Sequence, residues 1–185
     1  MHRSTTGTGG GIGKACEVGD VIVSQYVQFD SQKGLAREPF AQEAFSDSKP
    51  SPRLFSQAKT LFKANSDQLP RDNTRKPVIA PASGQPSGVL TTDFFGFDTS
   101  NNFYKLKGKG SLCEMGDAVL GLVVKQMDNK ALRRVAVRNV SDPQIKAEGT
   151  SKIRETSPHR STRDMGRWSN ICSASVCWAL VAAEK

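Results

Sequence analysis

A short apolar run of β type at residues 135–140 most constrains the fold of this chain. The run ends in Ser141 and Asp142, and Pro143 follows, which predicts that the strand stops there. These three residues also favour turns for local reasons, so a plain turn is the simpler interpretation. In open α/β sheets, however, ligands bind just beyond the carboxyl ends of the strands. Asp142 is therefore the first candidate for a general acid.

The length and composition predict one domain. The chain has 185 residues, of which 37% are hydrophobic, enough for one core, and 16 Gly and 9 Pro indicate many loops. The net charge of +8 would attract phosphate or nucleic acid. The basic residues are nevertheless scattered, without a nucleic-acid-binding motif or an aromatic-interleaved stripe. We expect a solvated basic surface, and nucleic-acid binding is the less favoured alternative.

The cysteines and the apolar segments indicate a cytoplasmic protein. The four cysteines are Cys16, Cys113, Cys172 and Cys177. They lack C-x-x-C spacing and the two histidines are isolated, so we expect reduced thiols and no metal site. The polar start of the chain does not resemble a signal peptide. The most apolar segment, 168–183, is interrupted by polar residues and is shorter than the roughly 20 residues of a membrane span.

Residues 5–13 read TTGTGGGIG and are predicted to form a glycine-rich loop. Consecutive glycines let the backbone approach a ligand and offer successive N–H groups to an anion. A Walker loop is excluded, because Thr8 replaces its first glycine and Ala15 its hydroxyl residue. The cofactor loop of short-chain dehydrogenases is excluded as well, because no strand can precede a loop so near the N-terminus. Neither tyrosine, moreover, has a lysine four residues on.

The remaining pattern predicts strands at 21–30 and 88–98, loops at 31–50 and 65–88, and helices beginning near residues 52 and 114 and spanning 168–183. Apolar residues at helical spacing, Met115, Ala118, Val119, Leu122, Val123 and Met127, predict the buried face of the second helix. Glu114 and Asp117 in its first turn complement the helix dipole. Alternatively, a carboxylate there holds sugar hydroxyls by charge-assisted hydrogen bonds.

Taken in order, these segments resemble the nucleoside phosphorylase superfamily, which includes purine nucleoside phosphorylases and methylthioadenosine/S-adenosylhomocysteine nucleosidases. The resemblance rests on TGTGGG at 6–11, GDVIV at 19–23, TDFF at 92–95, EM at 114–115 and VSD at 140–142. It covers residues 5–30 and 88–183. It implies an α/β fold with a mixed central sheet flanked by helices, in one domain over residues 1–185. That domain would be incomplete, the C-terminal portion of the family's domain, with a loop-rich insertion at about residues 31–87.

The resemblance also implies roles for individual residues. The implied substrate-binding residues are Thr8, Gly9, Gly10, Phe95, Gly96, Glu114, Met115 and Ser141, and the implied catalytic residue is Asp142. The first three would line the ribose and the phosphate or water side of the pocket. Phe95, with the backbone at Gly96, would meet the purine, and Glu114 and Met115 would lie against the ribose. Asp142 would protonate or hydrogen-bond N7 of the leaving base.

Two departures from the family matter. The Glu-Met-Glu signature reads EMG at residues 114–116, so the second glutamate, which normally holds the ribose hydroxyls, is missing. Asp117, one residue along a helix, would point about 100° away. Sugar recognition is therefore expected to differ or to be lost. The family's domain also has several strands before the glycine loop, so we expect marginal stability unless another chain covers the sheet edge.

The resemblance implies cleavage of the N-glycosidic bond of a purine nucleoside, by phosphorolysis or by hydrolysis. No cofactor is expected beyond inorganic phosphate as a candidate co-substrate, and the expected assembly is a homo-oligomer without membrane contact. The alternative is a non-catalytic nucleoside- or nucleotide-binding remnant of such an enzyme, which Gly116 favours. The sequence leaves both reactions open, because the family's phosphate-binding arginines would lie in the absent segment.

Overall fold

The computed structural model describes residues 2–12, 19–48, 52–65, 79–80, 87–94, 104–127, 133–145 and 170–182. The strands are β1 (His2–Ile12), β2 (Val21–Val23), β3 (Tyr26–Asp30), β4 (Ala44–Ser46), β5 (Ile79–Ala80), β6 (Gly88–Thr92), β7 (Leu112–Glu114) and β8 (Arg133–Ile145). The helices are α1 (Pro52–Asn65), α2 (Asp117–Gln126) and a third at residues 170–182.

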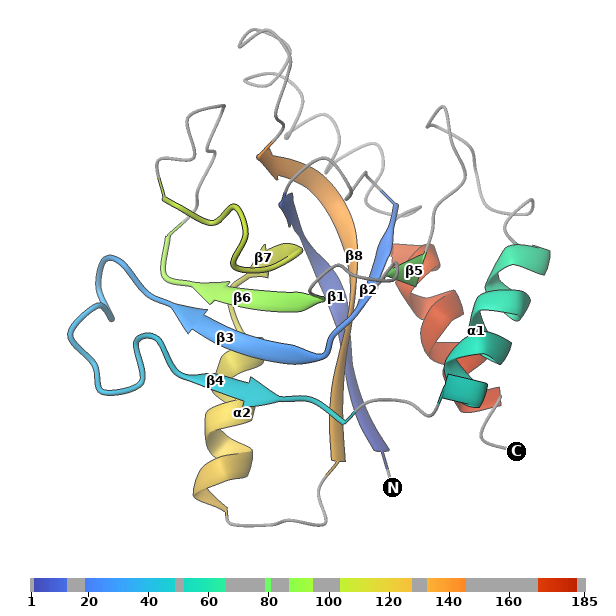
Figure 1. Cartoon of the computed structure of the whole chain (residues 1–185), viewed down its shortest axis with the longest axis horizontal. Coiled ribbons are helices and arrows are strands. Elements are labelled where there is room, and N and C mark those ends of the chain that lie inside the picture. The colour runs from blue at the N-terminus through green and yellow to red at the C-terminus, as the bar shows by residue number, and fades with distance from the viewer. Residues whose placement is uncertain are drawn as a thin grey trace, which may run out of the picture.

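All eight strands join one mixed sheet in the order β4-β3-β6-β7-β1-β8-β2-β5 (Figure 1). The two longest strands, β1 and β8, are parallel neighbours in this sheet. The pairs β3–β6, β6–β7 and β2–β5 are also parallel. The pairs β1–β7, β2–β8 and β3–β4 are antiparallel. The mixed sheet expected from the sequence is confirmed.

The sheet is curled, because β2 and β3 follow each other in the chain but have four strands between them in the sheet. The chain bends between them at Ser24 and Gln25. The Ser24 N–H donates to the Ala136 carbonyl on β8 at 2.8 Å, and the Gln25 N–H donates to the Ser87 carbonyl beside β6 at 3.0 Å. The single strand predicted for residues 21–30 is therefore two strands, which connect distant parts of one sheet.

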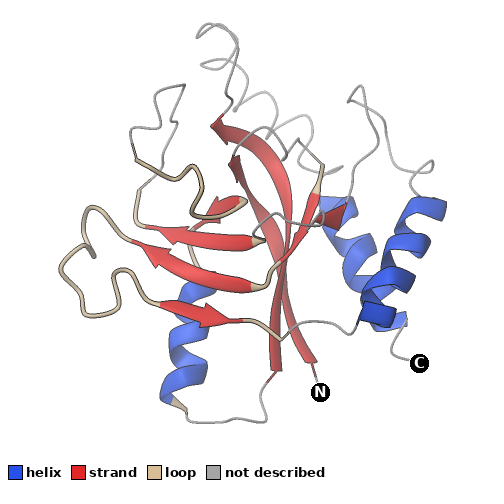
Figure 2. Ribbon diagram, viewed as in Figure 1, coloured by secondary structure: helices blue, strands red, loops and turns tan. Residues whose placement is uncertain are grey.

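The two faces of the sheet hold separate apolar clusters. Inside the curl, side chains from β2, β3, β4, β6, β7 and β8 meet Ala118 of α2. On the other face, Val21, Val135 and Val137 pack against α1 and residues 170–182, which lie side by side (Figure 2). Fully buried aliphatic side chains of this kind each contribute roughly 1.5–3 kcal/mol. The flanking helices are therefore held mainly by burial of apolar surface.

The first predicted helix is confirmed as α1, with Pro52 at its first position, where a missing N–H is tolerated. Ala58 and Phe62 are buried, and Phe55 and Leu61 pack beside them. This is the apolar face that the spacing predicted.

The predicted buried face of the second helix is confirmed at Ala118 and Leu122, which lie against the core, and is wrong at its other members. Val119, Val123 and Met127 are 46%, 42% and 61% exposed, whereas Ala118 and Gly121 are buried. A Cβ on Gly121 would lie 2.6 Å from the Phe45 ring. The helix backbone therefore sits directly against the sheet through its small residues, which leaves its larger apolar side chains outside.

Two predictions about the long strands are also wrong. Residues 5–12, predicted as part of a loop, lie in β1, which pairs with β8 from His2 opposite Arg133 to Gly9 opposite Val140. The proline at 143 does not end β8, because bulges shift the register between Gly9 and Gly10 and again after Gly11. Proline is tolerated at such bulges, since the ladder is already interrupted there.

The boundaries of two other segments differ from the prediction. β4 occupies residues 44–46, where a loop was expected. β6 ends at Thr92, and residues 95–98 of the predicted strand lie outside the described residues.

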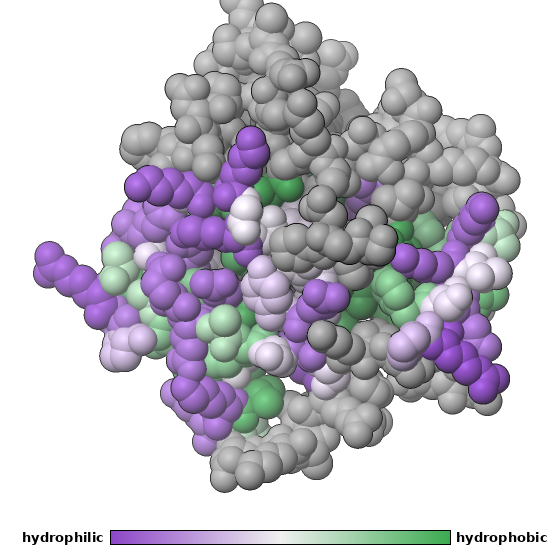
Figure 3. Space-filling view, viewed as in Figure 1, coloured by the Kyte–Doolittle hydropathy of each residue, from purple (hydrophilic) through white to green (hydrophobic). Residues whose placement is uncertain are grey.

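Hydrophilic side chains cover most of the described surface around β3 and β4 on the face shown in Figure 3. The exposed large apolar residues on the helices are Val119, Leu120 and Val123 of α2, and Ile171, Trp178 and Val181 of the third helix. Within the described ranges, none of the helices has the length and hydropathy that a membrane crossing requires.

The close approach at Gly121 gives a stability test. Gly121→Ala should destabilise the protein by about 1–2 kcal/mol, because the methyl group collides with Phe45 and this outweighs the better helix propensity of Ala. The control is Gly34→Ala, where a Cβ would meet nothing within 4 Å. Urea denaturation of both variants measures the difference, and equal midpoints would contradict the packing described for α2.

Candidate functional site

The register of three adjacent strands brings the predicted motifs into one row. Gly10 of β1 lies opposite Cys113 of β7 on one side and opposite Asp142 of β8 on the other. Neighbouring strands are about 4.8 Å apart, so the backbones of Cys113 and Asp142 are roughly 10 Å apart across the glycines. Glu114, the glycine run and the Ser-Asp pair, although far apart in sequence, therefore meet at one place in the sheet.

A β-bulge shapes the row on the β8 side. Gly9 pairs with Val140 and Gly10 pairs with Asp142, so Ser141 is the extra residue of the bulge. Ser141 is buried, and its hydroxyl donates to the Gly9 carbonyl at 3.3 Å. Bulges redirect side chains and are frequent next to active sites. Because of the bulge, Asp142 does not follow the regular alternation of residues along β8.

On the β7 side, Glu114 caps helix α2. Its carboxylate accepts the Gly116 N–H at 2.6 Å, the Asp117 N–H at 2.9 Å and the Thr91 hydroxyl at 2.5 Å. The Thr91 hydroxyl oxygen in turn accepts the Ala118 N–H at 2.8 Å. Gly116, at the N-cap position, has no side chain that could do this. Two neighbouring side chains thus satisfy the N–H groups that a helix start leaves open.

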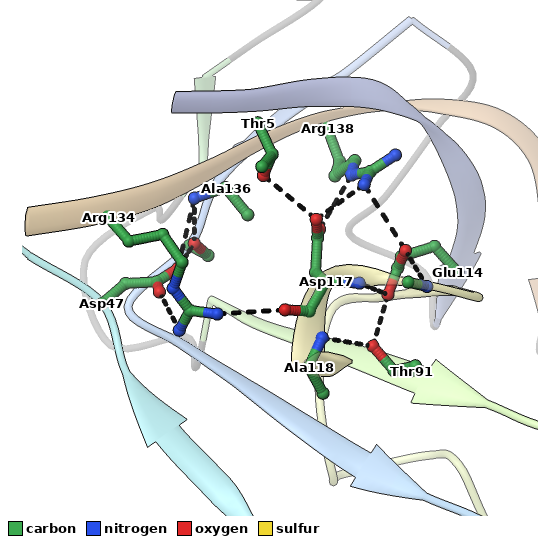
Figure 4. A network of polar contacts seen from close by, with 11 residues as sticks. Thr5, Asp47, Thr91, Glu114, Asp117, Ala118, Arg134, Ala136 and Arg138 are labelled. Carbon is green, nitrogen blue, oxygen red and sulfur yellow. Dashed lines mark hydrogen bonds and ion pairs between the residues drawn. The ribbon is translucent and has the colours of Figure 1, made fainter. Parts of the chain in front are cut away.

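Asp117, in the first turn of α2, forms the central ion pair with Arg138 of β8 (Figure 4). The guanidinium donates Nε–H to one carboxylate oxygen at 2.8 Å and Nη2–H to the other at 2.6 Å. The Thr5 hydroxyl of β1 donates to the same carboxylate at 3.0 Å. Arg138 also lies 3.4 Å from Glu114. A paired fork of this kind fixes the orientation of both side chains.

Gly7 leaves the space that the Arg138 guanidinium fills. The two residues are register partners, and a Cβ on Gly7 would lie 2.2 Å from Nη1 of Arg138. Any other residue at position 7 would displace the guanidinium. The fork to Asp117 uses Nε–H and Nη2–H of the guanidinium (Figure 4), and Nη1 is the atom that lies over Gly7.

A second buried ion pair supports the first. Arg134 of β8 lies 2.5 Å from the carboxylate of Asp47, which also accepts the Ser24 hydroxyl. The same Arg134 donates to the Asp117 carbonyl at 3.0 Å. The bend at Ser24, the end of β4 and the start of α2 are thereby joined through one strand.

Burial sets the protonation of both networks. Burial raises the pKa of Glu114, and the neighbouring Asp117 carboxylate adds to this, against hydrogen bonds from Thr91 and Asp117 and the charge of Arg138. Burial likewise raises the pKa of Asp47, although Ser24 and Arg134 oppose it. For Arg138, burial lowers the pKa, but Asp117 and Glu114 outweigh it, so the net shift is upward. The guanidinium therefore stays charged.

The structure gathers only part of the predicted set. Gly9, Gly10, Glu114 and Ser141 lie in or beside the row, and Met115, 62% exposed, follows Glu114 at the surface. Thr8 is next to Gly9 in β1, and successive residues of a strand face opposite sides of the sheet. Phe95 and Gly96 lie outside the described residues.

Sequence reasoning missed Arg138 as a site residue, and with it Thr5 and Thr91. A signal was present, because a charged residue inside an apolar strand seldom becomes buried without a partner. Asp117 was expected to point away from the glutamate position, and its carboxylate does bind Arg138 and Thr5 rather than lying beside residue 116. Its partner could not be inferred, because it depends on the register between β1 and β8.

Within the described ranges, the His, Cys, Asp and Glu side chains form no group that could hold a metal ion. Cys113, Cys172 and Cys177 form no disulfide there. Burial raises the pKa of the Cys172 thiol to about 12, so this cysteine is protonated and chemically inert at neutral pH.

No protein-family model and no curated protein sequence matches the chain. Solved structures do match. A 5'-methylthioadenosine/S-adenosylhomocysteine nucleosidase from Neisseria meningitidis, in complex with methylthio-immucillin-A, is 18% identical with a TM-score of 0.62, over 96% of this chain and 68% of that one. Futalosine hydrolase of Helicobacter pylori is 16% identical with a TM-score of 0.60, over 97% and 66% of the two chains. The nucleosidase from Colwellia psychrerythraea, in complex with adenine, is 18% identical with a TM-score of 0.63, over 97% and 66%.

The expected fold, that of the nucleoside phosphorylase superfamily to which these nucleosidases belong, is confirmed. The chain spans about two thirds of the length of these neighbours, 66–68%.

The capping carboxylate gives a pH test. In the folded protein, the pKa of Glu114 is raised above its ordinary value of 4.5. The stabilisation that the protonated carboxyl group gives the folded protein is therefore present below that value and is lost as the pH rises through the folded pKa. Glu114→Gln removes this contribution to the pH dependence of stability. The stability advantage of the wild type over the variant should therefore shrink between pH 4 and pH 7, by about 1.4 kcal/mol for each pKa unit of the shift.

Urea denaturation at several pH values measures this difference. Asp47 is present in both proteins, so the effect of its own raised pKa cancels. A wild-type advantage that grows with pH would show that the folded protein stabilises the ionised carboxylate instead.

Proposed function

We propose that the chain cleaves the N-glycosidic bond of a purine nucleoside by hydrolysis, with Asp142 as the general acid. The observation that carries this proposal is the row across β7, β1 and β8, which places Glu114, Gly10 and Asp142 on neighbouring strands of a nucleosidase fold. The adenine bound to the Colwellia nucleosidase and the methylthio-immucillin-A bound to the Neisseria nucleosidase support a nucleoside-type ligand with a purine base.

The charges around the row suit the chemistry. Breaking an N-glycosidic bond builds positive charge on the sugar and negative charge on the leaving base, as in glycoside hydrolysis. An acid at the base relieves that negative charge in the transition state, and such catalysis contributes about 10²–10⁴-fold. The two carboxyl groups of Glu114 and Asp117 face the single guanidinium of Arg138. This fixed arrangement favours a positively charged sugar.

The charges of Glu114, Asp117 and Arg138 also favour water over phosphate as the second substrate. Two carboxyl groups against one guanidinium would repel a phosphate dianion, whereas a neutral water molecule meets no such repulsion. The Nη1–H group of Arg138, which the fork to Asp117 does not use, would offer a donor for a water oxygen or a sugar oxygen. Inorganic phosphate remains the alternative co-substrate, and the assay below separates the two.

A second candidate function is ligand binding without cleavage. It is favoured by the engagement of Glu114 in capping α2 and by the absence of a side chain at Gly116. Binding of this kind would be saturable and would release no base.

The experiment is a base-release assay on a panel of purine nucleosides and methylthioadenosine, with and without phosphate, followed by chromatography. Release without phosphate is the expected result. Release only with phosphate would establish phosphorolysis. Binding without release would establish the second candidate, and neither binding nor release from folded protein would overturn both.

The general acid gives the mutational test. Asp142→Asn should lower the rate of base release by about 10²–10⁴-fold with the fold retained, because an amide cannot supply the proton. Glu38→Gln, at an exposed loop position, is the matched control and should keep the wild-type rate. Circular dichroism checks the fold of both, and an Asp142→Asn variant of full activity would remove Asp142 from the mechanism.

A further inference from the structure

The third helix carries no charge on either of its sides. None of the residues 170–182 is acidic or basic. One side is buried against the sheet through Cys172, Val176 and Ala179. A helix on the surface of a protein typically has charged and polar residues opposite its buried side. The outer side of this helix departs from that pattern and requires an explanation.

That outer side carries a stripe of three large apolar residues, Ile171, Trp178 and Val181. The steps of seven and three residues between them keep the three on one side of a helix. Trp178 is 61% and Val181 60% exposed, and the polar neighbours Asn170 and Ser175 are uncharged. The stripe exposes roughly 300 Å² of apolar surface, the size at which such patches often mark an interaction site.

Helix α1, beside the third helix, is positively charged. The two helices share one apolar cluster on the same face of the sheet (Figure 2), so the outer sides of both face away from the sheet. Helix α1 has three basic residues, Arg53, Lys59 and Lys63, and no acidic one. Arg53 and Lys63 are exposed. The apolar stripe therefore lies next to a helix that attracts negative charge.

We infer that the third helix and α1 together form a surface that binds an anionic phospholipid membrane. The apolar stripe enters the boundary between headgroups and acyl chains, where Trp is favoured, and the basic residues of α1 contact the anionic headgroups. The inference is independent of the proposed function.

The length of the third helix determines how it meets the membrane. Residues 170–182 span about 20 Å, whereas the hydrocarbon core of a membrane is about 30 Å thick. The helix therefore lies along the membrane surface and does not cross it. The sequence predicted no membrane contact because the segment at 168–183 is too short for a span, but surface binding does not require that length.

Two features favour a membrane over a macromolecular partner. A stable protein interface takes about 800 Å² from each partner, more than the apolar stripe offers. Nucleic-acid affinity comes mainly from phosphate contacts, which would leave Ile171 and Val181 exposed. A membrane boundary, in contrast, accepts a small apolar stripe without a complementary shape and is negatively charged as well.

The experiment is co-sedimentation of the full chain with vesicles. One set of vesicles is phosphatidylcholine alone, and the other is equal parts phosphatidylcholine and phosphatidylserine. The protein should bind the mixed vesicles at least about tenfold more tightly, because each Lys or Arg near an anionic surface strengthens binding several-fold. Added salt should weaken this binding, because it screens the charges.

The apolar stripe is tested by Trp178→Ser, which should weaken binding to the mixed vesicles about tenfold or more, because most of the inserted apolar area is lost. The matched control is Met127→Ser on α2. Met127 is also 61% exposed but lies outside the stripe, so this variant should bind like the wild type. Circular dichroism of both variants checks that they keep the fold.

The charge of α1 is tested by Arg53→Gln, which should weaken binding to the mixed vesicles about fivefold. The matched control is Arg37→Gln, at an exposed loop position away from α1, which should leave binding unchanged. Equal losses in these two variants would assign the attraction to the net charge of the chain and would overturn the role of α1.

Three further outcomes would overturn the inference. Equal binding to both sets of vesicles would remove the anionic lipid from it. Binding that Trp178→Ser leaves unchanged, or that Met127→Ser weakens equally, would show that the apolar stripe is not the contact. Absence of binding to either set by folded wild-type protein would exclude a membrane, and analytical ultracentrifugation would then show whether a second copy of the chain covers the stripe.

Discussion

The ion pair between Asp117 and Arg138 is the interaction on which the arrangement of the site depends. It joins the first turn of α2 to β8, and through Thr5 it also reaches β1. Removing the guanidinium would leave two buried carboxyl groups without their cation, a loss of roughly 3–5 kcal/mol for a buried pair. Three elements that are distant in sequence are thereby fixed in one geometry. The absence of a side chain at Gly7 is part of the same construction, since the guanidinium occupies that space.

The curl of the sheet depends on a similar polar contact. A chain that leaves a sheet and re-enters it with four strands between the two places interrupts the backbone pairing at the bend. Here the side chains of Ser24 and Asp47 accept the Ala136 N–H of β8, which faces the bend, and Arg134 neutralises the buried carboxylate. Because Arg134 also holds the Asp117 carbonyl, the bend and the site share one scaffold. The apolar core alone would not select this path for the chain.

Several elements that carry the candidate site were predictable from the sequence, but the geometry that joins them was not. Local sequence patterns predicted the strand at 135–140, the helix after Pro52 and the order of the motifs. The glycines at 7–11 were expected in a loop because glycine is rare in strands, yet β1 needs them where Arg138 and Leu112 approach the backbone. The burial of α2 through Gly121 was likewise hidden, because spacing rules count large apolar residues and miss close packing of small ones.

A shift of one residue along α2 changes what a carboxylate can do. A Cβ added at position 116, the N-cap, would meet only Glu114, whereas the side chain of Asp117 is buried against β8 and β1. The carboxylate of Asp117 therefore binds the Arg138 guanidinium, and this ion pair holds the strands and the helix together. Glu114 caps the same turn, so both acids at the start of this helix hold the backbone and the strands in place.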